Sequence, residues 1–184
     1  MSKTPLLPTL SCRECEVNDL ELRHPLITAN DWRSPLVLRL LDDTSYIDGS
    51  REITVYYQWQ SDTQTANVTL MWKGLASEFE KRVRTYQVPV LTEYATLGLA
   101  CVLIDEFAKL KITEVTRRGE RADYWLGNKE YLLEVSGQQS GNLESLRDTK
   151  RDQLLKNPFG RSGFVCVAVY DKKSSYLWFY EVTP

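Results

Sequence analysis

Hydrophobic and polar residues alternate between Arg121 and Gly137, and this alternation predicts two short strands joined by Gly127-Asn128-Lys129 as a turn. Side chains of a strand point to its two faces in turn, so Asp123 should share a face with Trp125. On the second strand, Glu134 should share a face with two neighbours, and the residues between them should point into the core. These sets are Leu132, Glu134 and Ser136 on one face, and Tyr131, Leu133 and Val135 on the other.

If these strands pair in the expected register, Asp123 and Glu134 converge on one surface. Two neighbouring carboxylates repel each other unless they share a proton or hold a cation. Carboxylate oxygens are preferred ligands of hard divalent cations, so the pattern predicts a site for Mg²⁺ or Mn²⁺.

A stretch that is apolar nearly all round, residues 92–107, predicts a helix buried against a sheet, with Thr92 as its N-cap. Glu93 heads an apolar stripe of this helix, and two interpretations stay open. Its carboxylate either lies in the first turn, near the positive end of the helix dipole, or reaches Asp123 and Glu134 as a third acidic group.

The remaining pattern after residue 90 predicts strands at 112–116, 164–170 and 176–182 and a helix at 143–156. Before it, residues 75–87 predict a short charged helix. Residues 1–16 predict a flexible lead-in, and residues 17–74 an antiparallel β region with strands at 17–23, 35–41, 52–60 and 66–72. The aromatic face of residues 53–59 is interpreted as a core face or, alternatively, a docking surface for a protein partner or a second copy.

Composition adds only broad limits. The chain has 184 residues and a net charge of −2, which argues against coating nucleic acid through bulk charge but leaves a local basic groove open. We find no apolar run of membrane-spanning length and no secretory signal, and the four scattered cysteines fit a reducing compartment. We therefore expect a cytoplasmic protein without a membrane partner.

The element order from residue 90 onward is α-β-β-β-α-β with one further strand. Together with Asp123 on the second strand and Glu134-Val135-Ser136 on the third, it resembles the PD-(D/E)xK, or restriction-endonuclease-like, nuclease superfamily. The resemblance covers about the C-terminal half of the chain, and Glu93 matches the helical acidic residue that some members carry. Ser136 stands where the motif has lysine, and Lys150 on the following helix is the best candidate replacement, with Arg147, Arg151 and Gln153 nearby.

This resemblance implies an α+β or α/β fold: a mixed sheet flanked by helices over residues 75–184, preceded by the antiparallel β region. It implies metal-assisted hydrolysis of phosphodiester bonds, with Glu93, Asp123, Glu134 and Lys150 as catalytic residues. The ligands of Mg²⁺ or Mn²⁺ would be Asp123, Glu134 and the carbonyl of Val135. Candidate contacts to nucleic acid, each equally readable as a solvent-exposed charge, are Arg117, Arg118, Arg121, Arg147 and Arg151.

Two functions stay open on these grounds. The first is a nuclease acting on DNA, less so on RNA, in prokaryotic antiviral defence or DNA processing. The second is a catalytically inactive member of the fold that serves as a binding subunit of a larger complex, which Ser136 and the mild acidity favour.

Overall fold

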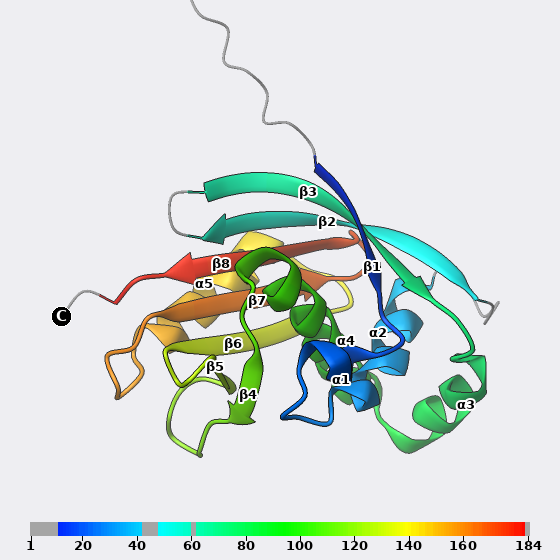
Figure 1. Ribbon diagram of the computed structural model, residues 1–184, viewed down its shortest axis with the longest axis horizontal. Coiled ribbons are helices and arrows are strands. Elements are labelled where there is room, and N and C mark those ends of the chain that lie inside the picture. The colour runs from blue at the N-terminus through cyan, green and yellow to red at the C-terminus, as the bar shows by residue number, and fades with distance from the viewer. Residues whose placement is uncertain (1–10, 42–47, 60–61, 183–184) are drawn as a thin grey trace, which may run out of the picture.

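The computed structural model describes residues 11–41, 48–59 and 62–182 and shows an α+β fold (Figure 1). Within those residues, the helices are α1 (Leu20–Arg23), α2 (Arg33–Leu40), α3 (Ala76–Thr85), α4 (Val88–Leu103) and α5 (Leu143–Leu154), with a 3-10 turn at Ala29–Trp32 and a π-helical turn at Ile104–Ala108. The strands are β1 (Ser11–Glu16), β2 (Gly49–Trp59), β3 (Asp62–Trp72), β4 (Ile112–Val115), β5 (Tyr124–Leu126), β6 (Tyr131–Gln138), β7 (Gly163–Val169) and β8 (Ser174–Tyr180).

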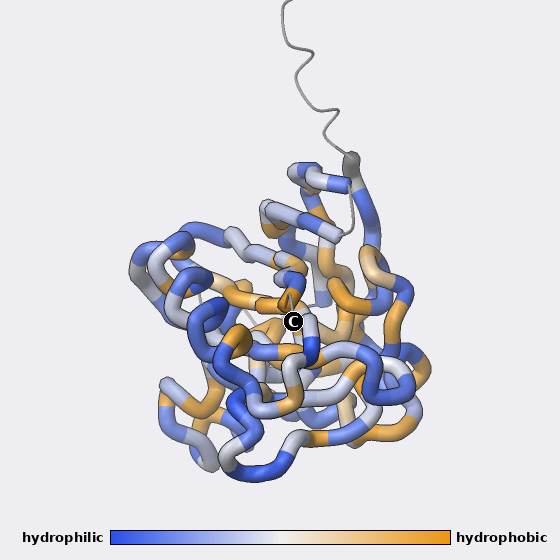
Figure 2. The backbone as a smooth tube through the Cα atoms, turned by 90° about the vertical axis from the view of Figure 1, so that its left-hand side faces the viewer, coloured by the Kyte–Doolittle hydropathy of each residue, from blue (hydrophilic) through white to orange (hydrophobic). Residues whose placement is uncertain are grey.

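All eight strands form one mixed sheet in the order β1-β3-β2-β8-β7-β6-β5-β4. β6 and β7 are parallel, whereas β4, β5 and β6 are antiparallel neighbours. The β2–β3 hairpin is antiparallel as expected, and β2 joins β8 in parallel, so both halves of the chain contribute to the same sheet. α4 packs on β6 and α5 lies across β6, β7 and β8. In Figure 2 hydrophobic segments gather toward the interior of the molecule.

Two of the strands predicted before residue 50 are wrong, because residues 20–23 and 33–40 are helical. Pro35 stands in the first turn of α2, where its missing N–H costs nothing. Leu36, Val37 and Leu40 are buried together at helical spacing. The apolar run therefore packs against α4 as a helix and does not form a strand. The predicted lead-in is also wrong for Ser11–Glu16, which pair with β3, and residues 1–10 lie outside the described ranges.

The aromatic face of β2 belongs to the core, which confirms the first of its two interpretations. Ile53, Val55 and Tyr57 are buried in the main hydrophobic cluster. Trp59 packs edge-on against Phe179, with ring centroids 4.7 Å apart. This face is therefore mostly covered by the protein itself.

α4 is the central helix, and it begins earlier than predicted. Its first residue is Val88 with Pro89 in the first turn, so Thr92 is not the N-cap; the Thr92 hydroxyl donates to the carbonyl of Val88 at 2.9 Å. Contrary to expectation, the helical stretch Val88–Ala108 is long and apolar enough to cross a membrane by length and composition. Because 67% of that window is buried inside the fold, the stretch is the core helix of the domain.

Gly137 marks the closest approach of β6 to α4. A Cβ placed there would lie 2.0 Å from Oγ1 of Thr96 and 3.1 Å from the carbonyl oxygen of Thr92. We expect Gly137→Ala to lower the free energy of unfolding by about 1–3 kcal/mol through overpacking, measured by chemical denaturation. Gly49→Ala is the matched strand control, since its Cβ would make only an ordinary 3.9 Å contact with Trp72. Equal stability of both variants would contradict the prediction.

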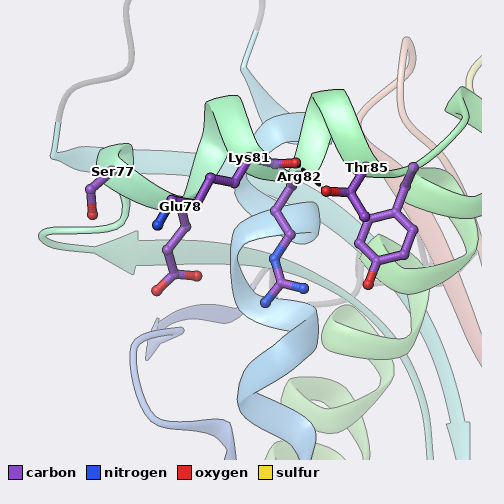
Figure 3. Close-up of a pocket in the computed structure, with 6 residues that line it drawn as sticks. Ser77, Glu78, Lys81, Arg82 and Thr85 are labelled. Atoms are coloured by element: carbon purple, nitrogen blue, oxygen red, sulfur yellow. Dashed lines mark hydrogen bonds between the residues drawn. The ribbon is translucent and has the colours of Figure 1, made fainter.

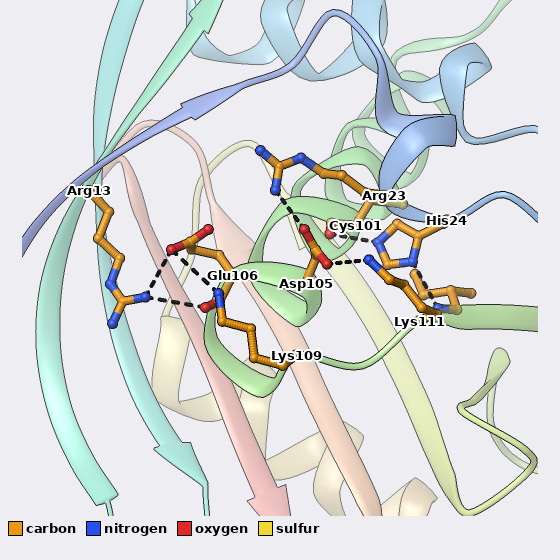
Figure 4. Close-up of polar contacts among 9 residues, drawn as sticks. Arg13, Arg23, His24, Cys101, Asp105, Glu106, Lys109 and Lys111 are labelled. Carbon is orange, nitrogen blue, oxygen red and sulfur yellow. Dashed lines mark hydrogen bonds and ion pairs between the residues drawn. The ribbon is translucent and has the colours of Figure 1, made fainter.

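A buried histidine fixes the start of β4 against the end of α4 (Figure 4). Nε2 of His24 lies 2.7 Å from the carbonyl of Cys101, and Nδ1 accepts the amide of Ile112 at 2.8 Å. The neutral ring with its proton on Nε2 satisfies both bonds, and burial lowers the pKa of His24. Beside it, Asp105 pairs with Arg23 at 2.8 Å. These contacts fix β4, the edge strand next to β5, to the end of α4.

Candidate active site

The two carboxylates predicted to converge are brought together where β5 meets β6. Tyr124 pairs with Leu133, and the amide of Asp123 donates to the carbonyl of Leu133 at 2.9 Å. Oδ2 of Asp123 accepts a hydrogen bond from the amide of Val135 at 2.7 Å. The Asp123 side chain thus extends the hydrogen bonding between β5 and β6 by one position before β5 begins. Asp123 is thereby tied to the residue that follows Glu134.

The alternation along β6 is as predicted. Leu133 and Val135 are buried in the cluster beneath α4, whereas Leu132 is buried in the second cluster, with α5. Glu134 therefore points toward α5, and its side chain is only 2% exposed. A fully buried carboxylate requires a partner that satisfies its charge.

Lys150 is that partner. It lies on the sheet-facing side of α5, one turn from the buried Leu146 and Leu154. Its Nζ donates to Oε1 of Glu134 at 2.7 Å, and its side chain is 20% exposed. α5 is anchored at its start by Asn142, whose side chain accepts the amide of Ser145. A lysine from the helix after β6 thus reaches the acidic residue of the motif.

Burial is the main cause of the raised pKa of both carboxyl groups. Burial, and then the charge of Asp123, raise the pKa of Glu134 to about 7, against the opposing effect of Lys150. Burial also raises the pKa of Asp123; the Glu93 charge adds to this rise, and the Val135 amide and Lys150 oppose it. Negative charge at this site is therefore costly, and a cation placed at these carboxylates would relieve the cost.

Glu93 is exposed on α4 and lies near the site. Its charge raises the pKa values of both Asp123 and Tyr124. Because α4 begins at Val88, Glu93 is in the second turn, and no acidic residue lies in the first. Favourable placement at the helix dipole therefore does not explain Glu93, and a role as a third acidic group of the site stays a prediction.

The five candidate arginines lie on two segments, α5 and the stretch before β5. Arg147 stacks its guanidinium 4.6 Å from the ring centroid of Tyr176 and bonds Asp148, on the β8 side of α5. Arg151 pairs with Asp148 and with the neighbouring Asp152. The other three, Arg117, Arg118 and Arg121, are exposed in the segment before β5.

The donor types of the site fit a hard divalent cation. Asp123, Glu134 and the carbonyl of Val135 would offer oxygen ligands, which hard divalent cations prefer. In the described part of the chain, no group of three or more His, Cys, Asp or Glu side chains is arranged to hold a metal ion. Such a cation would be held by these two carboxylates and backbone oxygen.

Two of the pockets among the described residues border α3 and α5. One on α3 has a volume of about 360 Å³, but its Glu78 is held by Arg33 and its Arg82 by Asp31 (Figure 3). The other, of about 380 Å³, lies between α5 and the segment before β5. The sequence singled out Arg121 and Gln153 among its residues but not Thr149 or Lys156. The spacing of seven residues between these two, about two turns of the predicted helix, was the available signal.

Comparison with known proteins adds no relative, because no protein-family model, curated protein or solved structure matches this chain.

Proposed function

We propose that this chain is a divalent-metal-dependent nuclease of the PD-(D/E)xK superfamily that hydrolyses phosphodiester bonds in DNA. The order α4-β4-β5-β6-α5-β7 supports this proposal, as does the convergence of Asp123 and Glu134 at the second and third strands of that series. A cytoplasmic role in prokaryotic defence or DNA processing is part of the same proposal.

The ion pair between Lys150 and Glu134 carries the proposal. Ser136 occupies the lysine position of the motif, and its short side chain bears no charge. The 2.7 Å contact from Nζ of Lys150 supplies an ammonium group at the acidic motif residue from the following helix. A lysine at this place is what the proposed chemistry requires.

The residues have separate tasks in this mechanism. A bound Mg²⁺ or Mn²⁺ would polarise the scissile phosphate and lower the pKa of a bound water. Asp123 and Glu134 hold the negative charge that binds the cation, and the Val135 amide keeps Asp123 oriented toward β6. Lys150 orients Glu134 and supplies positive charge where the phosphate gains negative charge. Glu93 adds a carboxylate from α4.

Lys150→Met tests the proposal, because methionine keeps an unbranched apolar side chain and removes the charge. We expect cleavage of plasmid and single-stranded DNA with Mg²⁺ or Mn²⁺ to fall by about 10²–10³-fold, the usual loss when a group that stabilises developing charge is removed. Lys172→Met, at an exposed position in the turn between β7 and β8, is the matched control. Wild-type rates in a folded Lys150→Met protein, verified by its thermal melt, would remove Lys150 from the mechanism.

A non-catalytic binding module is the second candidate, and the burial of Glu134 favours it. With 2% of its side chain exposed and Lys150 already bound, Glu134 is satisfied without a metal, as in a structural ion pair. Titration calorimetry with Mg²⁺ and Mn²⁺ separates the candidates. Metal binding that is lost in Glu134→Gln supports the nuclease. No heat of binding, together with no cleavage of plasmid, single-stranded DNA or RNA, supports the module.

A further inference from the structure

The pocket between α5 and the segment before β5 adjoins the carboxylate site. It has a volume of about 380 Å³ and is lined by Arg121, Thr149, Asp152, Gln153 and Lys156. Along the chain, Arg121 precedes Asp123 by two residues, and Thr149 directly precedes Lys150. Both walls of the pocket therefore continue into the residues of the candidate active site.

The two walls are fixed by backbone structure. Thr149 and Gln153 lie one helical turn apart on α5, and Lys156 follows just after the helix ends. Opposite them, Arg121 has a φ of 56°, a left-handed conformation that few non-glycine residues adopt. A residue stays in such a conformation only when its surroundings determine it. Arg121 is thus held at the pocket by the turn that leads to Asp123.

The charge of the pocket is positive. Arg121 and Lys156 supply two cations, and neither forms an ion pair within the described residues. The one acidic lining residue, Asp152, already pairs with Arg151 at 2.9 Å. Gln153 contributes an amide group, and the Thr149 hydroxyl donates to the carbonyl of Ser145, which leaves its oxygen able to accept. Two unpaired cations beside neutral polar groups are suited to an anion.

We propose that this pocket binds a phosphodiester group of the DNA strand, next to the phosphate at Asp123 and Glu134. The identity of the ligand rests on the proposed nuclease function, whereas the pocket and its charge do not. Phosphate contacts from arginine and lysine fix the register of a protein on nucleic acid. Arg121 and Lys156 thereby set which bond of the strand lies at the carboxylates, and they are positioning residues rather than catalytic ones.

Binding in the absence of metal tests the pocket separately from catalysis. The probe is a short fluorescently labelled DNA duplex, with its single strand in parallel, titrated by anisotropy in excess chelator over a series of salt concentrations. The variants are Arg121→Asn, since asparagine tolerates left-handed backbone, and Lys156→Gln. The controls are Lys172→Gln and Arg84→Asn; Arg84 is 77% exposed on α3, at the far end of the molecule from α5 (Figure 1).

We expect each pocket variant to weaken DNA binding roughly tenfold, as for one lost charge-assisted hydrogen bond. Each should also reduce the slope of log affinity against log salt by about 1. Unchanged DNA affinity and salt slope in both variants would overturn the proposal that this pocket binds a phosphodiester group, whatever the cleavage assays show. Weaker binding of a nucleoside monophosphate with unchanged DNA binding would assign the pocket to a free nucleotide and overturn the proposal. Weaker DNA binding alongside normal cleavage by Glu134→Gln would support the pocket and reject the nuclease mechanism.

Discussion

Glu134→Gln is expected to reduce metal-dependent cleavage of DNA by at least about 10²-fold, because a metal's stabilisation of transition-state charge is worth several kcal/mol. Glutamine keeps the size and an acceptor oxygen of the side chain but removes the charge that would hold the cation. It also leaves Lys150 with a weaker partner than the carboxylate that it now contacts at 2.7 Å. Plasmid nicking with Mg²⁺ or Mn²⁺ measures the loss, and excess chelator should reduce the wild-type rate to the same level.

Glu130→Gln is the matched control for this variant. Glu130 is exposed in the turn between β5 and β6, so the same substitution there removes a charge from the same hairpin without touching the buried pair. We expect its cleavage rate to equal that of the wild type. If Glu134→Gln, folded by circular dichroism, also cleaved at the wild-type rate, the carboxylate at β6 would have no part in the reaction.

The second large effect is on stability as a function of pH. The pKa of Glu134 is raised from 4.5 in the unfolded chain to about 7 in the folded protein. The contribution of Glu134 to the free energy of unfolding is therefore fully present below pH 4.5, and it is lost as the pH rises through 7. The shift corresponds to a loss on the order of 3 kcal/mol in the free energy of unfolding across that window. The raised pKa of Asp123 acts in the same direction.

Urea unfolding of the wild type and Glu134→Gln at several pH values between 4.5 and 7.5 measures this contribution. Glutamine does not titrate, so the difference between the two proteins should change with pH by about the stated amount. His24 is present in both proteins; its lowered pKa removes stability as the pH falls below 6.5 and cancels in the difference. Parallel pH curves for the two proteins would show that Glu134 does not titrate in this range.

The carboxylate site could be predicted because it depends on local alternation. The period of two along β6 placed Glu134 on the face opposite Leu133, and the structure confirms this. Lys150 was chosen because the resemblance allows the lysine to come from the following helix, and its Nζ lies 2.7 Å from Oε1 of Glu134. Patterns of this kind are kept in the folded protein, because a shift of one residue in the strand register would bury the wrong set of side chains.

The N-terminal elements could not be predicted from the same patterns. The apolar run that includes Leu36, Val37 and Leu40 is as compatible with a buried strand as with a helix, and only packing against α4 decides. The next helix was expected to begin at residue 92, whereas it begins at Val88 with Pro89 in its first turn. The left-handed backbone at Arg121 has no signal in its residue type, because arginine has no preference for it.

The parallel pairing of β2 with β8 has a consequence for how the chain folds. The β2–β3 hairpin can form early and locally, but the free edge of β2 stays open until β8 arrives from the opposite end of the described chain. Its apolar face stays open until later segments cover it, such as the one with Phe107, which packs on Tyr57. Contacts this distant in sequence slow folding, because loop-closure entropy is lost before they form. In the meantime Ile53, Val55 and Tyr57 are available to other chains, and this exposed apolar face favours aggregation during synthesis.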